Sequence, residues 1–219
     1  MRALRETELE TLLQGAKTIE ADGHGLKVAR LANGSFLKLF RRKRLLSSSL
    51  WSPPAQRFAD NARQLVSLGI PAPVIIDIFQ LPRNRANGVL YEPLPGDTLR
   101  NHWRDLEPAR RNSEVQSFGR FLARLHQLGV YFRSLHLGNV LLLPDGQFGL
   151  IDLSDMRISG HPLAAGKRRR NLQHILRYKE DVQWLAKEHR LALLEGYAQG
   201  SSAESANSLA SAIQRLHPN

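Results

Sequence analysis

Two neighbouring stretches decide the fold: Gly129-Val-Tyr-Phe-Arg-Ser-Leu-His-Leu-Gly-Asn-Val-Leu-Leu-Leu143 and Gly149-Leu-Ile-Asp-Leu-Ser154. The apolar runs 140–143 and 148–151 are separated by Pro144-Asp145-Gly146. Pro, Asp and Gly are the residues that tight turns prefer, so the two runs are predicted to pair as a hairpin.

Polar residues flank this predicted hairpin. Phe132-Arg133-Ser134, four further residues and Asn139 reproduce the spacing of the protein kinase catalytic loop, H-R-D-x-x-x-x-N, and Asp152 lies where a kinase holds Mg²⁺ on the nucleotide phosphates. Asn and Asp suit Mg²⁺ because this hard ion takes oxygen ligands. The alternative interpretation is that Asn139 caps a turn and Asp152 ends a strand.

Two earlier features fit the same plan. Lys38 lies inside the apolar run Phe36-Leu-Lys-Leu-Phe40, where a kinase lysine would reach the nucleotide phosphates, although a lysine facing water from an edge strand is common. Tyr91-Glu92-Pro-Leu-Pro-Gly96 resembles the strand and turn of the inter-lobe hinge where adenine binds, which makes Glu92 a candidate cofactor-binding residue.

Over about residues 27–185 the sequence resembles the bacterial lipopolysaccharide kinase family of heptose and Kdo sugar kinases, including its short members labelled toluene-tolerance proteins. The segments that carry the resemblance are Leu135-His-Leu-Gly-Asn139, Leu150-Ile-Asp152 and Leu68-Gly-Ile-Pro-Ala-Pro73. The resemblance implies ATP, Mg²⁺ and phosphate transfer to a sugar of the lipopolysaccharide inner core. It also implies that Lys38 binds phosphate and that Asn139 and Asp152 bind the metal.

The fold class that follows is α+β and protein-kinase-like. A small N-terminal antiparallel-sheet lobe is expected over residues 1–92, and a larger, mostly helical C-terminal lobe over residues 93–219. The boundary is expected at the turn Pro93-Leu-Pro-Gly96, where the chain changes character.

The catalytic loop departs from the kinase pattern. Ser134 replaces the Asp that accepts the proton of the substrate hydroxyl, and Phe132 replaces the usual His. Serine is not a base at neutral pH. His136 could take the proton because an unperturbed imidazole titrates near neutrality, or it could simply structure the loop. Ser134, His136 and Arg133 are therefore the candidate catalytic residues.

The partner of the lysine also differs, because no Glu occurs between Glu20 and Glu92. On the helix expected over residues 55–68, Asn61 flanks the apolar face, whereas Asp60 points nearly opposite to it. Asn61 is therefore favoured over Asp60 as the helix residue that meets Lys38.

A missing base leaves several functions open. A positioned general base contributes about 10²- to 10⁴-fold in rate, but phosphoryl transfer depends mainly on positioning and charge stabilisation, so turnover need not be abolished. The first hypothesis is a kinase-like phosphotransferase that phosphorylates or senses a lipopolysaccharide sugar. The alternatives are an inactive pseudokinase serving as a nucleotide- or anion-binding scaffold, and, third, a basic RNA-associated protein.

The composition favours an anionic partner. The 219 residues include 31 Lys and Arg against 20 Asp and Glu, a formal net charge of +11, with 42% hydrophobic residues and no cysteine. The absence of cysteine excludes a disulfide scaffold and a cysteine nucleophile. Aromatic residues make up only 7%, which offers little stacking surface and makes nucleic acid an unlikely partner.

Two basic tetrads are either solvated faces or a surface for an acidic membrane, where each charge contributes about 1 kcal/mol. They are Arg41-Arg42-Lys43-Arg44 and Lys167-Arg168-Arg169-Arg170. No apolar run is long enough to span a bilayer, and the N-terminus does not have the pattern of a signal peptide. We therefore expect a cytoplasmic protein with peripheral contact at the inner membrane.

The remaining expected elements follow from periodicity and turn residues. Thr7 to Glu10 has capping-box spacing and predicts a short helix, and the last twenty residues, rich in Ser and Ala, are expected to fray at their end. The other predictions are strands over 27–31, 36–40, 73–79 and 89–92 and helices over 55–68, 114–128 and 172–189.

Overall fold

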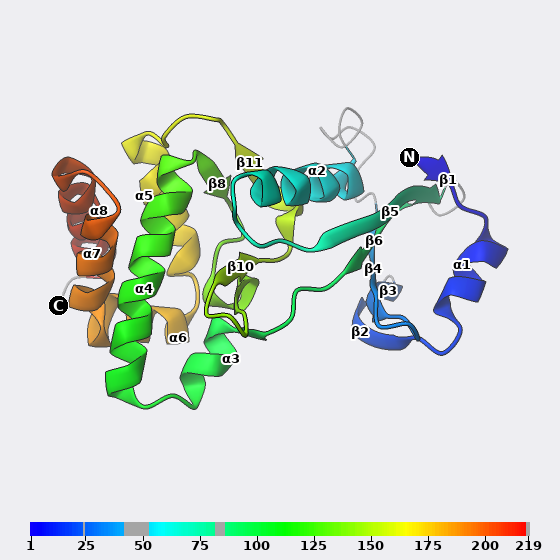
Figure 1. Ribbon diagram of the computed structural model, residues 1–219, viewed down its shortest axis with the longest axis horizontal. Helices are drawn as coiled ribbons and strands as arrows, with labels where there is room; N and C mark the ends of the chain where they lie inside the picture. The colour runs from blue at the N-terminus through cyan, green and yellow to red at the C-terminus, as the bar shows by residue number, and fades with distance from the viewer. Residues whose placement is uncertain (24, 42–52, 82–85, 218–219) are drawn as a thin grey trace. The chain divides into compact units, whose positions relative to one another are not determined.

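The computed structural model describes residues 1–23, 25–41, 53–81 and 86–217. The chain divides into two compact units (Figure 1). The first comprises Met1–Leu94 together with Leu153–Asp155, and the second comprises Pro95–Asp152 and Met156–Asn219.

The first unit is built on a six-stranded sheet with the order β1-β5-β6-β4-β3-β2, in which only the β1–β5 pair is parallel. The predicted hairpin of β3 and β4 is confirmed. The strands are β1 (Arg2–Ala3), β2 (Lys17–Asp22), β3 (Gly25–Arg30), β4 (Phe36–Arg41), β5 (Val74–Leu81) and β6 (Ala86–Glu92).

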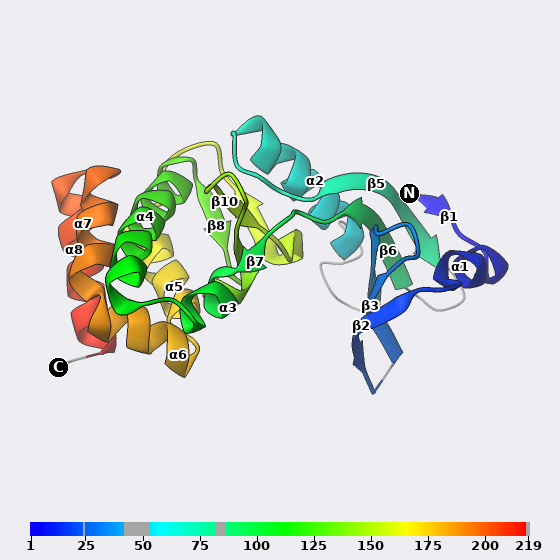
Figure 2. The ribbon, with the colours of Figure 1, turned by 60° about the horizontal axis from the view of Figure 1, so that its bottom comes forward.

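Helices α1 (Glu6–Leu13) and α2 (Pro54–Ser67) lie on opposite faces of this sheet (Figure 2). Leu37 and Leu39 of β4 face the apolar cluster on which α1 packs. Because side chains alternate along a strand, Phe40 faces the other side, where its ring lies 6.4 Å from that of Phe58 in α2. The apolar alternation of β4 thus separates a core face from a face that α2 covers.

The second unit is mostly helical. Its helices are α3 (Leu99–Arg104), α4 (Pro108–Gln127), α5 (Ala165–Ile175), α6 (Lys179–Val182), α7 (Arg190–Gln199) and α8 (Ala203–Leu216), with a π-helical segment Gln183–Glu188. Two small sheets accompany them, one formed by β7 (Asp97–Thr98), β9 (Val140–Leu142) and β10 (Phe148–Leu150), the other by β8 (Val130–Phe132) and β11 (Met156–Ile158).

Helices α4 and α7 pack closely because glycines occupy their crossing. A Cβ on Gly119 would collide with the Leu193 carbonyl, and a Cβ on Gly196 would collide with the Gln116 carbonyl. Aromatic side chains fill the interior of the unit, among them the fully buried Trp103. The predicted α+β class, with a small sheet lobe and a larger helical lobe, is confirmed.

Three helix predictions were wrong in their boundaries, and one of these helices, expected from residue 114, begins at Pro108 as α4. The N-cap of α1 is Arg5, whose backbone amide donates to Glu8 Oε2 at 2.8 Å, so Thr7 lies inside the helix. The single helix expected over residues 172–189 is interrupted, because Tyr178 adopts an extended conformation and begins α6 as its N-cap. The interruption allows Tyr178 to stack on the Arg100 guanidinium at 4.2 Å.

The Ser- and Ala-rich C-terminal segment forms helix α8. Helix α8 begins at the Ser202 cap, whose hydroxyl accepts from the Ser205 amide at 3.3 Å. Leu209, Ala212 and Ile213 are buried on one face of α8. The Ser- and Ala-rich composition conceals this apolar face, which is sufficient to dock the helix.

Candidate functional site

The β9–β10 hairpin brings the two metal candidates to adjoining positions. Val140 pairs with Leu150, and the Ile151 amide donates to the Asn139 carbonyl at 3.1 Å. Asp152 follows Ile151 directly, so Asn139 and Asp152 stand at the same end of the hairpin. The turn chemistry recognised in the sequence therefore produces a local pair of oxygen-bearing side chains.

The Asn139 amide is held in one orientation. The residue is 8% exposed, and its Nδ2 donates to the Ser134 carbonyl at 2.8 Å. The backbone amide of Asn139 donates to the His136 carbonyl, also at 2.8 Å. Because the side-chain nitrogen is committed to Ser134, the side-chain oxygen is the end that can face a cation.

Asp152 has an unusual backbone conformation. Its φ of 57° makes it the one non-glycine residue in the left-handed region among the described residues. Such conformations are costly for L-residues, persist only where the surroundings impose them, and concentrate at functional sites. This uncommon conformation keeps Asp152 as a candidate functional residue.

The segment after Asp152 belongs to the first unit and is held by α2. Asn61 Nδ2 donates to the Leu153 carbonyl at 2.7 Å, and Arg57 Nε donates to the Ser154 carbonyl at 3.0 Å. Asn61 is buried, whereas Asp60 is oriented toward Gln56, whose Nε2 donates to its carboxylate. The structure thus gives Asn61 a contact with the backbone that follows Asp152.

The centre of the catalytic loop rests on a buried carboxylate. Asp181 is 0% exposed, and its Oδ2 accepts from the Leu137 amide at 3.1 Å. Arg100 donates to the same carboxylate twice, from Nε at 2.9 Å and from Nη2 at 2.8 Å. The hydrogen bonds with Asp181 raise the pKa of Arg100. A bidentate pair of this kind fixes the carboxylate that in turn holds the loop.

His136 is tied into the same loop. Its Nδ1 accepts from the Gly138 amide at 3.1 Å, and its ring packs edge-on against Tyr178 at a centroid distance of 4.9 Å. Burial lowers the pKa of His136, and the charge of Arg100 lowers it further. The imidazole is therefore neutral near pH 7 with its proton on Nε2, and its basic nitrogen is already engaged. This geometry favours the loop-structuring interpretation of His136.

The other two catalytic candidates flank the start of the loop. Arg133 is exposed, and Ser134 is half-buried, with its carbonyl occupied by Asn139. The backbone oxygen of Ser134 thus orients the Asn139 amide.

Lys38 lies on an interior strand of the first unit. Strand β4 runs between β3 and β6, and Lys38 pairs with Val28 on one side and Val89 on the other. Its Nζ lies 5.7 Å from the centroid of the Phe40 ring, on the face that α2 covers. The alternative of a lysine on an edge strand is therefore wrong. Glu92 is the exposed last residue of β6, opposite Val74.

The two basic tetrads differ. Arg42, Lys43 and Arg44 lie outside the described residues, and Arg41 lies 4.0 Å from the Asp22 carboxylate. In the second tetrad three side chains are exposed, whereas Arg168 is half-buried and donates from Nε to the Leu163 carbonyl at 2.7 Å. The exposed members are Lys167, Arg169 and Arg170.

The donor set fits Mg²⁺ in combination with phosphate. Within the described ranges, no group of three or more His, Asp or Glu side chains could hold a metal by itself. Asn139 and Asp152 offer oxygen ligands, and Mg²⁺ commonly takes one or two such protein ligands together with substrate phosphates and water. The pair is therefore suited to a metal that arrives with a phosphorylated ligand.

Two features of the structure were missed by the sequence reasoning. The first is the Asp181–Arg100 pair, which has no local signal because Asp181 follows two other charged residues, Lys179 and Glu180. The second is the turn between β2 and β3, which carries Gly23 and Gly25 in the same sheet as Lys38.

No helix in the described part of the chain is long and apolar enough to cross a membrane.

Comparison with known proteins identifies the family of the chain. A model of the lipopolysaccharide kinase (Kdo/WaaP) family matches residues 19–197, more than three quarters of the chain, and the match includes every candidate residue described above. No match was found among curated proteins. With its catalytic-loop spacing, its Asn–Asp pair and its strand lysine within the matched region, the chain belongs to the lipopolysaccharide kinase (Kdo/WaaP) family.

Proposed function

We propose that this protein is an ATP- and Mg²⁺-dependent phosphotransferase that acts on a sugar hydroxyl of the lipopolysaccharide inner core. In this proposal Lys38 contacts nucleotide phosphate, Asn139 and Asp152 bind the metal, and Glu92 lies at the adenine. The observation that carries it is the Asn139–Asp152 pair, with the amide of Asn139 oriented by Ser134 and Asp152 in a strained backbone conformation.

Each residue has a task that its contacts support. Lys38 lies on an interior strand, which holds its backbone in place while its ammonium group contacts a phosphate oxygen. The Gly23 and Gly25 turn can approach phosphate closely because glycine has no side chain. Asn61 serves as a positioning residue, since it holds the Leu153 carbonyl next to Asp152. Bound Mg²⁺ would neutralise phosphate charge.

The missing base is compatible with slow transfer. In phosphoryl transfer, most of the acceleration comes from positioning and electrostatic stabilisation. We propose that Ser134 positions the acceptor hydroxyl, that exposed Arg133 attracts an anionic acceptor, and that His136 maintains the loop. The proton of the hydroxyl then passes to solvent or to the transferred phosphate, at a cost of about 10²- to 10⁴-fold in rate.

A pseudokinase remains the second candidate because of the same serine. In that case the residues around Lys38, Asn139 and Asp152 bind a nucleotide without turnover. The exposed Lys167, Arg169 and Arg170 would serve either protein, because each suits contact with an acidic membrane that presents lipopolysaccharide precursors.

Phosphate transfer from labelled ATP to purified lipopolysaccharide core tests the proposal. We expect Asp152→Ala and Asn139→Ala to reduce transfer at least 100-fold. The matched control is Asp145→Ala in the turn of the same hairpin, where the carboxylate accepts from the backbone and side chain of Gln147, and it should retain transfer. Transfer by wild type no greater than by Asp152→Ala contradicts the enzymatic proposal.

The effect of restoring a carboxylate distinguishes the two candidates. For an enzyme that lacks only its base, Ser134→Asp should raise kcat about 10-fold or more without changing the KM for ATP. A Mg²⁺-dependent thermal shift with ATP, in the absence of transfer by wild type and Ser134→Asp, identifies the pseudokinase. No shift at millimolar ATP contradicts both.

A further inference from the structure

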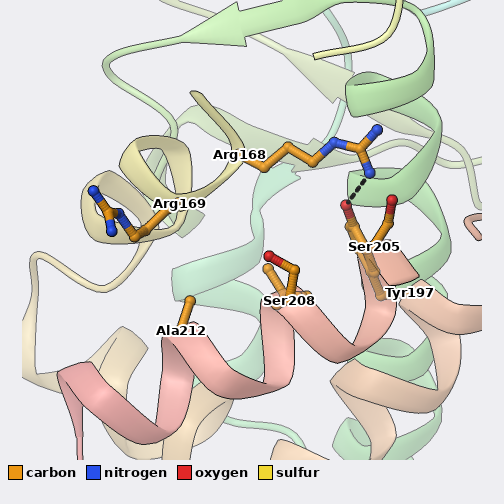
Figure 3. A pocket seen from close by; sticks show the side chains of 7 residues that line it. Arg168, Arg169, Tyr197, Ser205, Ser208 and Ala212 are labelled. Carbon is orange, nitrogen blue, oxygen red and sulfur yellow. Dashed lines mark hydrogen bonds between the residues drawn. The ribbon is translucent and has the colours of Figure 1, made fainter. Parts of the chain in front are cut away.

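A pocket of about 210 Å³ opens between α5, α7 and α8 (Figure 3). This volume includes space open to solvent, so the pocket suits a small group bound at its mouth and not a drug-sized ligand. Its polar wall contains Arg168 and Arg169 of α5, Tyr197 of α7, and Ser205 and Ser208 of α8, and no acidic residue lines it. No residue assigned to phosphate transfer lies in its wall, so it is a second site.

Arg168 is built into this pocket. Figure 3 shows its side chain crossing from α5 toward Tyr197, whereas the Arg169 guanidinium lies toward the other side. Arg168 Nε donates to the Leu163 carbonyl at 2.7 Å, and Nη1 donates to the Tyr197 hydroxyl at 3.4 Å. Among the described residues, neither arginine is paired with a carboxylate. A half-buried guanidinium with hydroxyls around it and no counter-ion matches the chemistry of phosphate recognition.

Two buried polar contacts lie between the pocket and the catalytic loop. The Tyr197 hydroxyl lies 2.8 Å from His126 Nδ1, and Asn171 Nδ2 donates to the Phe132 carbonyl at 2.6 Å. Tyr197, His126 and Asn171 are each 0% exposed. Phe132 immediately precedes Arg133 and Ser134, so the path ends at the first residue of the loop.

The direction of the bond between Tyr197 and His126 depends on the tautomer of the imidazole. In the tautomer in which the Tyr197 hydroxyl accepts from Arg168 and donates to His126 Nδ1, the imidazole proton lies on Nε2. His126 Nε2 and Asn171 Oδ1 are both buried without a hydrogen-bond partner in the described part of the chain. They are a donor and an acceptor of matching polarity, so a small shift that brought them together would complete the path.

We propose that this pocket binds a phosphate group, either free or as a phosphomonoester, and that Tyr197, His126 and Asn171 transmit its occupancy to the backbone at Phe132. An anion on Arg168 takes guanidinium donors and neutralises the charge that acts on the Tyr197 hydroxyl. The bond between Arg168 and Tyr197 is the first to respond. The proposal does not depend on nucleotide binding, so it stands or falls separately from the phosphotransferase proposal.

Titration of the full-length, nucleotide-free protein with inorganic phosphate at constant ionic strength tests the pocket. We expect Arg168→Gln to weaken phosphate binding at least 10-fold. The matched control is Arg170→Gln, an exposed arginine of the same helix outside the pocket wall, which should change it less than twofold. Circular dichroism establishes that each variant is folded. Arg168→Lys keeps the charge but loses the two-pronged geometry, so its affinity for phosphate should lie between those of Arg168→Gln and Arg170→Gln. Equal weakening by Arg168→Gln and Arg170→Gln would show diffuse charge attraction and overturn the site.

Hydrogen exchange tests the path. Phosphate should slow exchange of the amides over residues 133–139 several-fold in wild type. Tyr197→Phe keeps the ring but removes the hydroxyl, so phosphate should still bind within about fivefold while this protection is lost. Protection that persists in Tyr197→Phe contradicts transmission through the hydroxyl.

Vesicles distinguish the source of the phosphate. If the ligand is a lipid phosphomonoester, Arg168→Gln should weaken binding to phosphatidic acid vesicles and leave binding to phosphatidylserine vesicles of equal charge unchanged. If the ligand is soluble, the variant should lose inorganic phosphate binding and bind both vesicles as wild type does. Equal binding of phosphate and both vesicles by wild type and Arg168→Gln overturns the site.

Discussion

Two buried polar networks in the second unit reach the same loop in different ways. The network around Asp181 is charged, and none of its buried side-chain atoms lacks a partner within the described residues. The network around His126 is neutral, and two of its buried atoms, His126 Nε2 and Asn171 Oδ1, have no partner there.

The two networks differ in how easily they can rearrange. A desolvated carboxylate with three donors has one favourable arrangement, because any movement leaves a charge uncompensated. A neutral chain with an open donor and acceptor can shift at lower cost. The loop is thus held at Leu137 by a rigid anchor and contacted at Phe132 by a path that has room to rearrange.

The largest expected effect is the loss of the charged anchor. Asp181→Asn leaves Arg100 without its counter-ion, and breaking a buried ion pair from one side costs about 3–5 kcal/mol. Urea denaturation should show this decrease in the free energy of unfolding, together with faster hydrogen exchange at Leu137.

The control for Asp181→Asn is a neighbouring exposed ion pair. Arg104 Nη2 contacts Glu180 at 2.9 Å, with side chains 53% and 34% exposed. Exposed pairs contribute about 0–1 kcal/mol, so Arg104→Gln should have a small effect. If the two variants lose the same stability, the Asp181 network is not the rigid anchor that we infer.

The neutral network should show itself in the pH dependence of stability. Burial, and after it the charge of Arg168, lowers the pKa of His126 to about 3, whereas an unfolded histidine titrates near 6.5. The folded state therefore binds fewer protons between these values, so stability is fully present above pH 6.5 and falls toward pH 3. From pH 6.5 to pH 5 the loss is about 2 kcal/mol for this one group.

Comparison with His126→Gln isolates that contribution. The variant should show a shallower decrease of unfolding free energy over the same pH range. Some slope will remain because burial also lowers the pKa values of His136 and His189. An unchanged slope in His126→Gln would mean that His126 is not held neutral in the fold.

The local parts of the site could be predicted from the sequence. Asn139 and Asp152 lie within one hairpin, and turn residues and apolar runs are read over a few neighbouring positions. The same applies to the hairpin that carries Lys38. The position of Lys38 on an interior strand could not be predicted, because strand order depends on pairing with β6, some fifty residues away.

The buried networks could not be predicted for the same reason. Asp181 joins Arg100 and Leu137 across 81 and 44 residues, and His126 joins Tyr197 across 71. Asp181 also lies in a segment whose periodicity predicts one continuous helix, whereas the chain breaks at Tyr178 to admit it. Local periodicity carries no information on which distant polar group will satisfy a buried one.

The smallest effect is expected when one hydroxyl is removed from the neutral path. In Tyr197→Phe the ring remains packed, and the loss is the bond to His126 Nδ1 at 2.8 Å together with the weaker contact from Arg168. Deleting a neutral hydrogen bond costs about 0.5–1.5 kcal/mol, well below the cost of Asp181→Asn. Urea denaturation of Tyr197→Phe and Asp181→Asn side by side compares their losses of unfolding free energy. Equal losses would mean that the path is as rigid as the anchor, and a path without freedom to shift could not report an occupied pocket to the loop.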